Sequence, residues 1–171
     1  FLWSEFCDWY IELTKARLYD KENVRAKNTA LYVLRTVLER TMRLLHPFMP
    51  FLTEEIWQKL PHEGRSIMRA QWPKVDEKDI DAEAEAAMTA IMEVIKVTRN
   101  LRAELGTPPG KKSALLLRVR DAALGDVFAA HMDYFHALAS ASEVTFLAED
   151  APDPENVVTG ALAGAAVYLP L

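Results

Sequence analysis

The strongest helical pattern in the sequence lies at residues 23–46, NVRAKNTALYVLRTVLERTMRLLH. Apolar side chains recur there at steps of three and four residues, which places them on one face of a helix of about six turns. These core candidates are Val24, Leu31, Leu34, Leu38, Met42 and Leu45. We therefore expect a long amphipathic helix at the centre of a helical bundle.

The opposite face of this predicted helix is basic. The stretch contains five Lys and Arg residues and one acid, Glu39. A turn of about 100° per residue brings together the candidate contact residues Arg25, Tyr32, Arg35, Arg40 and Arg43. A charged helix face often does no more than face water, and that interpretation stays open. The sign of the charge favours a surface that binds nucleic acid.

The composition is that of an ordinary globular protein. Half of the 171 residues are apolar, which is enough for one or two domains with a core. No apolar run approaches the roughly 20 residues that cross a bilayer, so we expect a cytoplasmic protein with no membrane partner. The single cysteine, Cys7, excludes an internal disulfide. Phe1 lies inside a helical pattern, and we expect the chain to be a piece of a longer protein.

Charge is divided unevenly along the sequence. Residues 1–112 carry 18 Lys and Arg against 17 Asp and Glu, whereas residues 113–171 carry 2 against 8. Positive charge is therefore concentrated locally in the first part only. A nucleic-acid partner fits that part, and the acidic second part would repel it.

Helices flank the basic stretch on both sides. Residues 1–19 are rich in aromatic side chains and show a wide apolar face, so we expect a helix covered on two sides, with Asn23 as the N-cap of the next helix. Residues 46–50, HPFMP, predict a rigid corner. Thr53 is the predicted N-cap of a short helix that Pro61 stops.

Three aromatic side chains near the predicted corner can be either buried or exposed. Phe48, Phe51 and Trp57 could fill the core or present an aromatic surface, and we favour the core. Residues 79–105 then predict another long helix, with acids at its start and bases at its end. Arg99, Arg102, Lys111 and Lys112 form a second basic group at that end. The glycines and prolines at 106–112 have the wrong spacing for a phosphate-binding loop.

The pattern changes at residue 113. Residues 114–119 and 144–147 predict strands, residues 121–139 a helix between them, and residues 157–169 a hairpin. The first two strands should be parallel, because a helix connects them. The expected fold class is mainly α, with a helical bundle at 1–112 followed by a small β-α-β-β subdomain at 113–171.

The sequence contains no recognisable catalytic or metal-binding arrangement. It lacks a nucleophile elbow, a glycine-rich dinucleotide turn and a cluster of metal ligands. His131 and His136 are about 140° apart on a helix, a poor arrangement for sharing a metal. From the residues alone, we expect a protein that binds folded RNA.

Four motifs resemble one family of enzymes. They are FLWSEFCDWYIE at 1–12, LHPFMPFLTEEIW at 45–57, SIM at 66–68 with WP at 72–73, and RNLRAE at 99–104 with PPGKK at 108–112. In this order they are similar to the C-terminal part of the valyl-tRNA synthetases. The corner motif is shared among the class I synthetases for aliphatic amino acids, while FCDWY and SIM with WP point to the valyl member.

The resemblance implies an anticodon-binding helical bundle with a small α/β subdomain. The full-length enzyme would join valine to its tRNA using ATP and Mg²⁺. The His-Ile-Gly-His and Lys-Met-Ser-Lys-Ser signatures of the class I active site are absent from this chain. We therefore expect no catalytic residue, cofactor or metal within it. Its expected partners are the anticodon stem-loop of valine tRNA and the catalytic domain of the same polypeptide.

The two basic groups supply the candidate tRNA-binding residues. Arg25, Arg35, Arg40 and Arg43 are expected to contact phosphates or base edges. An unpaired base could stack on Tyr32, His46 or Phe48. Arg99, Arg102, Lys111 and Lys112 are expected to hold RNA backbone elsewhere. Two alternatives stay open: a module that braces the synthetase body, and the equivalent domain of an isoleucyl- or leucyl-tRNA synthetase.

Overall fold

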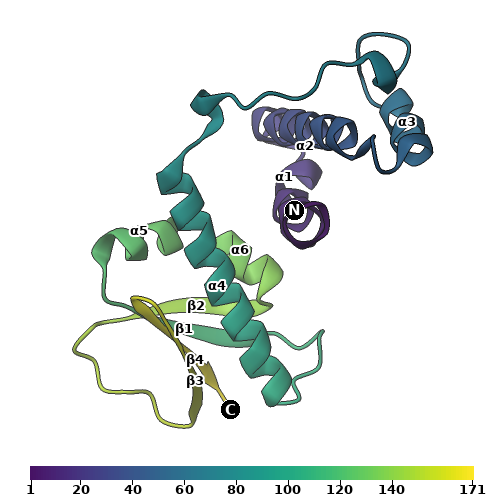
Figure 1. Cartoon of the computed structure of the whole chain (residues 1–171). Coiled ribbons are helices and arrows are strands. Elements are labelled where there is room, and N and C mark those ends of the chain that lie inside the picture. Colours follow the sequence, from purple (N-terminus) through teal and green to yellow (C-terminus); the bar gives the residue numbers. More distant parts are fainter. The chain divides into compact units, whose positions relative to one another are not determined.

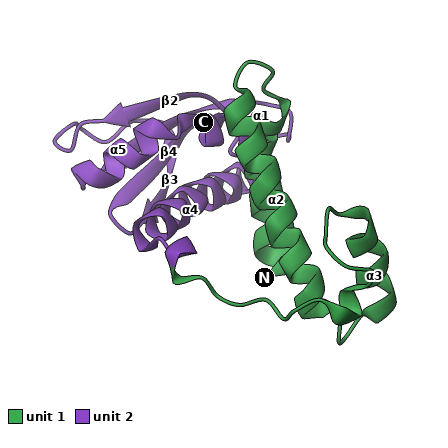
Figure 2. Ribbon diagram, turned by 90° about the horizontal axis from the view of Figure 1, so that it is seen from above, with its two compact units in different colours: residues 1–77 green, residues 78–171 purple.

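The chain forms two compact units in a computed structural model that describes residues 1–171 (Figure 2). The first unit spans Phe1–Glu77 and the second Lys78–Leu171. The sequence placed the boundary between 112 and 113 instead. The structure assigns the helix before that position to the second unit, because this helix packs on the sheet.

The first unit is helical throughout. Its elements are the π-helix η1 (Leu2–Tyr10), α1 (Ile11–Tyr19), α2 (Val24–Leu45), α3 (Pro50–Lys59) and the short 3₁₀-helix η2 (Ile67–Arg69). The predicted helix over residues 1–19 is confirmed, although its first half is wound more widely: the Phe6 N–H donates to the carbonyl of Phe1, 3.2 Å away. Phe6 and Trp9 are buried, whereas Trp3 is exposed, so the predicted covering of a second side is wrong there.

Helix α2 begins where the sequence predicted. The Asn23 side chain accepts a hydrogen bond from the Ala26 N–H at 3.0 Å, which satisfies a free donor of the first turn. The predicted core face is wrong in the first half, where Val24 and Leu31 are exposed and Ala30 is buried. The periodicity of large side chains does not reveal a small residue that packs closely. In the second half, the prediction for Met42 is confirmed.

A small core joins α2, α3 and η2. Met42, Trp57 and Ile67 are buried together, and Leu38, Leu45, Ile56 and Ala70 pack against them. The indole N–H of Trp57 donates to Glu39 Oε1 at 2.7 Å, so the buried ring has its polar atom satisfied. This core is complete without the other aromatic side chains of the corner.

The corner between α2 and α3 differs from the prediction in two ways. Helix α3 begins at Pro50, whose fixed φ suits a first turn, and Thr53 lies one turn inside the helix instead of capping it. Phe48 and Phe51 are exposed and only Trp57 is buried, because Trp57 alone fills the space beside Met42. The prediction that all three aromatics belong to the core is therefore wrong for two of them.

The second unit places one face of a sheet against helices (Figure 1). Its elements are η3 (Glu77–Asp79), which begins at the boundary, α4 (Ala82–Glu104), β1 (Ser113–Val119), α5 (Ala122–Ala130), α6 (Met132–Leu138), β2 (Ala141–Leu147), β3 (Val157–Leu162) and β4 (Ala165–Pro170). The strand order is β2-β1-β4-β3. The parallel pairing of β1 with β2 and the β3–β4 hairpin confirm the predicted β-α-β-β arrangement.

Helix α4 packs on β3 and β4, α5 on β1 and α6 on β2. The side chains of Leu115, Leu117, Val167 and Leu169 alternate along the two central strands and are fully buried. The single helix predicted over 121–139 is divided at His131, where the backbone leaves the helical region. No helix of the structure is both long enough and apolar enough to span a membrane.

Candidate nucleic-acid interface

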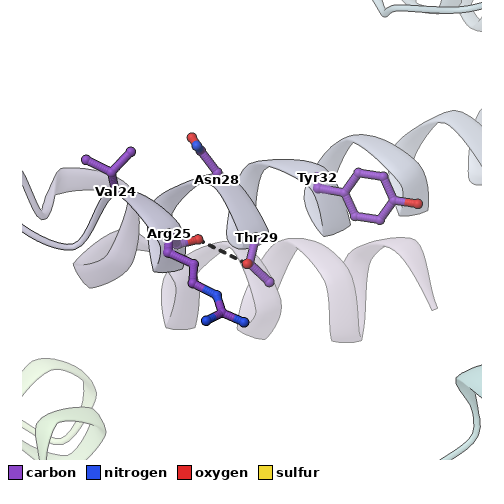
Figure 3. A pocket seen from close by; sticks show the side chains of 5 residues that line it. All are labelled: Val24, Arg25, Asn28, Thr29 and Tyr32. Atoms are coloured by element: carbon purple, nitrogen blue, oxygen red, sulfur yellow. Dashed lines mark hydrogen bonds between the residues drawn. The ribbon is translucent and has the colours of Figure 1, made fainter.

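An open groove runs along the exposed face of α2 (Figure 3). It is lined by Val24, Arg25, Asn28, Thr29 and Tyr32, which lie on one side of the helix because their spacing is three or four residues. The Thr29 hydroxyl donates to the Arg25 carbonyl at 3.0 Å and is thus directed toward its own helix. Arg25, Asn28 and Tyr32 supply the groove with a cation, an amide and an aromatic ring.

Arg35 extends this face by one turn beyond Tyr32. Its guanidinium carbon lies 5.7 Å from the centroid of the Tyr32 ring, a cation–π distance. The Tyr32 side chain is 60% exposed. Neither Arg25 nor Arg35 has a carboxylate partner in the chain. Their positive charge is therefore uncompensated by a nearby acid.

The two remaining arginines of the predicted basic face are less accessible. Arg43 forms an ion pair with Glu39 at 2.7 Å, and its Nη1 donates to the Gln71 carbonyl at 2.6 Å. Glu39 in turn accepts from Trp57, so Arg43 belongs to a network that joins α2, α3 and the segment after η2. Arg40 is half-buried. The exposed basic face is narrower than the sequence predicted, because Arg43 is engaged by Glu39 and Gln71 and Arg40 is half-buried.

His46 and Phe48 lie at the corner and have different surroundings. The His46 Nδ1 is 2.8 Å from Thr53 Oγ1, and the Thr53 hydroxyl donates to the Met49 carbonyl. The Thr53 hydroxyl has one proton to donate, and in either tautomer of His46 the contact with Nδ1 joins the end of α2 to α3. Phe48 is 82% exposed and is free of such restraint. Of these two predicted stacking residues, His46 holds the corner and Phe48 lies on its surface.

The residues of the second basic group also differ in their surroundings, since some are engaged within the fold and others are exposed. Arg102 is buried: its Nη1 donates to Ser113 Oγ at 2.8 Å and its Nη2 donates to the Lys111 carbonyl. It therefore holds the turn in place and has little surface for a ligand. Arg99 donates to the Leu138 carbonyl at 2.8 Å, at the end of α6. Lys111 and Lys112 are exposed in the turn.

Glu54 has a carboxyl whose pKa is lowered by its neighbours. A hydrogen bond from Gln58 lowers the pKa of its carboxyl, and hydrogen bonds from Ser66 Oγ and the Ile67 N–H act in the same direction. The positive charge that His46 can carry adds to this effect. Glu54 thus connects α3 to η2, and it is a structural residue.

Metal-ligating side chains are not gathered in this structure. No group of three or more His, Cys, Asp or Glu side chains lies close enough to hold a metal ion. Asn28 and Thr29 are groove residues that sequence reasoning missed, and it assigned a third, Val24, to the core. Asn28 and Thr29 are three or four residues from both Arg25 and Tyr32, so helical spacing places them on the same face. They were overlooked because neither side chain is charged.

Comparisons with known proteins identify the family to which the chain is similar. The family described as the anticodon-binding domain of tRNA ligase matches residues 1–118. Over its whole length the chain is 43% identical to the valine–tRNA ligase of Listeria monocytogenes, 45% to that of Bacillus cereus and 46% to that of Carboxydothermus hydrogenoformans. It spans 19% of the length of each of these relatives. The valyl resemblance is confirmed, and an isoleucyl or leucyl assignment is not favoured.

The family match also covers α4 and most of β1, so it crosses from the first compact unit into the second. It ends near the boundary at 112 that the sequence predicted. The division into compact units and the extent of the family match therefore describe different properties of the chain. Both the helical unit and the matching relatives lead to one assignment: this chain belongs to the family of anticodon-binding domains of tRNA ligases.

Proposed function

We propose that the chain binds the anticodon stem-loop of valine tRNA as part of a valine–tRNA ligase, with the exposed face of α2 as its main contact surface. The observation that carries the proposal is the uncompensated charge of Arg25 and Arg35 on either side of the exposed ring of Tyr32. An unpaired RNA base stacks on an aromatic ring, while arginine binds the phosphates that flank it.

Each residue of the groove has a role in this proposal. Arg25 and Arg35, ten residues apart and therefore separated by roughly 15 Å along the helix axis, bind phosphates on either side of the stacked base. Tyr32 provides the stacking surface. The Asn28 amide, one turn before Tyr32, can both donate to and accept from a base edge, which makes it the candidate for reading the base. Lys111 and Lys112 are proposed to contact RNA backbone at another place.

The activity of the full-length ligase would lie outside this chain. The relatives are named valine–tRNA ligases, and we propose that the ligase containing this chain joins valine to its tRNA with ATP and Mg²⁺. The residues here do not fit those ligands: the turn at 106–112 has two prolines where a phosphate loop needs N–H donors, and no group of three or more His, Cys, Asp or Glu side chains is placed to hold a metal ion. We assign this chain to recognition, in the cytoplasm, beside the catalytic part of the same polypeptide.

The test is a binding measurement on the purified chain. Its affinity is determined for the valine anticodon stem-loop and for a copy with the anticodon bases exchanged, each at two salt concentrations. We expect tighter binding to the native loop and a steep loss of affinity at the higher salt concentration. Equal affinity for both loops would mean that the surface is only an electrostatic platform, and a lack of binding at low salt would contradict the proposal.

A further inference from the structure

The corner between α2 and α3 carries a cluster of exposed apolar side chains. Five large ones lie within nine residues, which are Leu44, Phe48, Met49, Phe51 and Leu52. Phe51 is 91% exposed. Scattered apolar residues are common on protein surfaces, but a contiguous group of this kind marks an interaction site. We call these five residues the apolar corner.

The apolar corner is held rigidly by the backbone beneath it. The N–H groups of Phe48 and Met49 both donate to the Leu45 carbonyl, at 2.9 and 3.0 Å. The His46–Thr53 hydrogen bond joins the end of α2 to the first turn of α3. A surface that is already fixed loses little conformational entropy when a partner covers it.

The apolar corner does not serve the core of its own unit. That core consists of Met42, Trp57 and Ile67 with the residues packed on them, and it is closed without Phe48 or Phe51. Replacing either phenylalanine should therefore leave the fold intact. Since the two side chains do not stabilise the fold from within, their exposure calls for another explanation.

The chemistry of the apolar corner favours a protein partner over RNA. RNA-binding surfaces are rich in Lys and Arg, whereas none of the five residues is charged. The acids that follow are engaged elsewhere, Glu54 with η2 and Glu55 with Lys59 at 2.7 Å. Phe and Met are enriched at the dry centres of protein interfaces.

We propose that the apolar corner docks against an apolar surface of the catalytic part of the full-length ligase. This inference rests on the proposed function, because it takes the chain to be part of such an enzyme. The chain spans 19% of the length of its relatives, so most of a ligase of that size lies outside these 171 residues. A rigid, uncharged corner would fix the position of the anticodon-binding region relative to that remainder.

The experiment is hydroxyl-radical footprinting, which oxidises Met and Phe side chains at rates that follow their exposure to solvent. Three samples are compared: this chain alone, this chain with valine tRNA, and the full-length ligase without tRNA. We expect Phe48, Met49 and Phe51 to be oxidised about fivefold more slowly in the ligase than in the chain alone, because docking excludes water. Met68, 78% exposed in the same unit, reports the general oxidation rate of each sample.

A substitution then connects this protection to the apolar corner itself. In the full-length ligase, Phe51→Ser should return Met49 to the oxidation rate of the isolated chain. Val75→Ser is the matched control, because Val75 is 83% exposed in the same unit but lies away from the corner in sequence. It should leave the protection unchanged. Circular dichroism of both variants in the isolated chain checks that the fold is retained.

Two outcomes would overturn the inference. Protection that appears only when tRNA is added would mean that RNA covers the apolar corner. Equal oxidation in all three samples would mean that no partner covers it. Failure of the proposed function looks different: the isolated chain would not bind the stem-loop, whereas the protection of Met49 in the ligase would be unaffected.

Discussion

Arginine serves two purposes in this chain, and the surroundings of each side chain distinguish them. Arg43 and Arg102 donate to backbone carbonyls and hold segments in place. Arg25 and Arg35 are exposed and have no acidic partner. Only the second kind can give its charge to a ligand without first losing an internal hydrogen bond or ion pair.

This division predicts how binding responds to substitution. Arg25→Ala and Arg35→Ala should each weaken binding to native and exchanged stem-loops alike, and each should reduce the slope of log affinity against log salt by about 0.7 to 0.9. Arg120→Ala is the matched control, since Arg120 is an exposed arginine of the second unit. Salt slopes that stay equal in all three variants would show that the α2 face is only hydrated.

Tyr32→Ala should act differently from the arginine variants. Loss of a stacked base costs about 1–3 kcal/mol, and we expect most of that loss on the native stem-loop, so that discrimination between the two loops decreases. Tyr32→Phe keeps the ring and should retain the discrimination. Filter binding or fluorescence anisotropy with both loops measures this difference. An equal loss in Tyr32→Phe would assign the effect to the hydroxyl instead.

The Glu54 carboxyl predicts a dependence of stability on pH. Its pKa is lowered in the folded state, first by the hydrogen bond from Gln58, so the group stabilises the fold above its ordinary pKa near 4.5. This stabilisation is lost as the pH falls through the lower folded pKa. Glu54→Gln should therefore be less stable than the natural chain at pH 6 and closer to it near about pH 3. Urea unfolding across this range measures the difference, and a constant gap would contradict it.

At this scale the sequence revealed residue types but not their partners. Helical spacing predicted the basic face of α2, including its exposed arginines Arg25 and Arg35. The Glu39–Arg43 pair has the i,i+4 spacing of a helix, but the second partner of Arg43, Gln71, is 28 residues away and could not be predicted. Arg102 likewise depends on a turn whose path only the folded chain shows. Contacts of this kind leave no periodic signal.

At the scale of elements, α4 lies very close to β3 at Gly160. A Cβ atom built on Gly160 would lie 2.2 Å from Val97 Cγ1 and 3.3 Å from Leu101 Cδ1. Valine has little freedom at χ1 and cannot easily withdraw. The absence of a side chain at Gly160 is therefore what allows the helix to lie this close to the strand.

Two glycine substitutions should consequently change the free energy of unfolding in opposite directions. Gly160→Ala should destabilise the chain by about 1–3 kcal/mol through overpacking. Gly125→Ala meets no neighbouring atom within 4 Å and lies inside α5, so it should stabilise by about 0.5–1 kcal/mol. Urea unfolding of both variants checks the pair. A neutral Gly160→Ala would mean that α4 moves away from β3 at little cost.

The types of the elements were predictable, whereas their ends and corners were less so. Periodicity predicted the long helices, both strands of the parallel pair and the hairpin, because each has a regular apolar repeat. It did not predict the break at His131 or the start of α3 at Pro50. The break and the start of α3 both depend on local backbone geometry. From its side chain alone, Thr53 was as suitable an N-cap as a residue nearer to Pro50.

At the scale of the whole molecule, charge and architecture are divided in the same way. The helical unit at 1–77 carries 12 Lys and Arg against 11 Asp and Glu, and the unit at 78–171 carries 8 against 14. The uneven charge found along the sequence thus persists when the boundary moves from 112 to 77.

The position of the boundary can be tested with two shorter pieces of the chain. Residues 78–171 should unfold cooperatively in urea, because they keep α4 on β3 and β4. Residues 113–171 lack α4 and would expose the face around Gly160, so they should show no cooperative transition. An equally cooperative transition in the shorter piece would restore the boundary at 112 as the limit of a folding unit.

The order of the strands has a consequence for synthesis on the ribosome. β4 follows the other three strands in the chain, yet it lies between β1 and β3 in the sheet. Until residues 165–170 have left the exit tunnel, β1 can pair only with β2, and β3 has no neighbour at all. The helices of residues 1–77 rely on contacts that are complete long before then. The nascent chain should thus acquire its helical unit early and its sheet in a single late step.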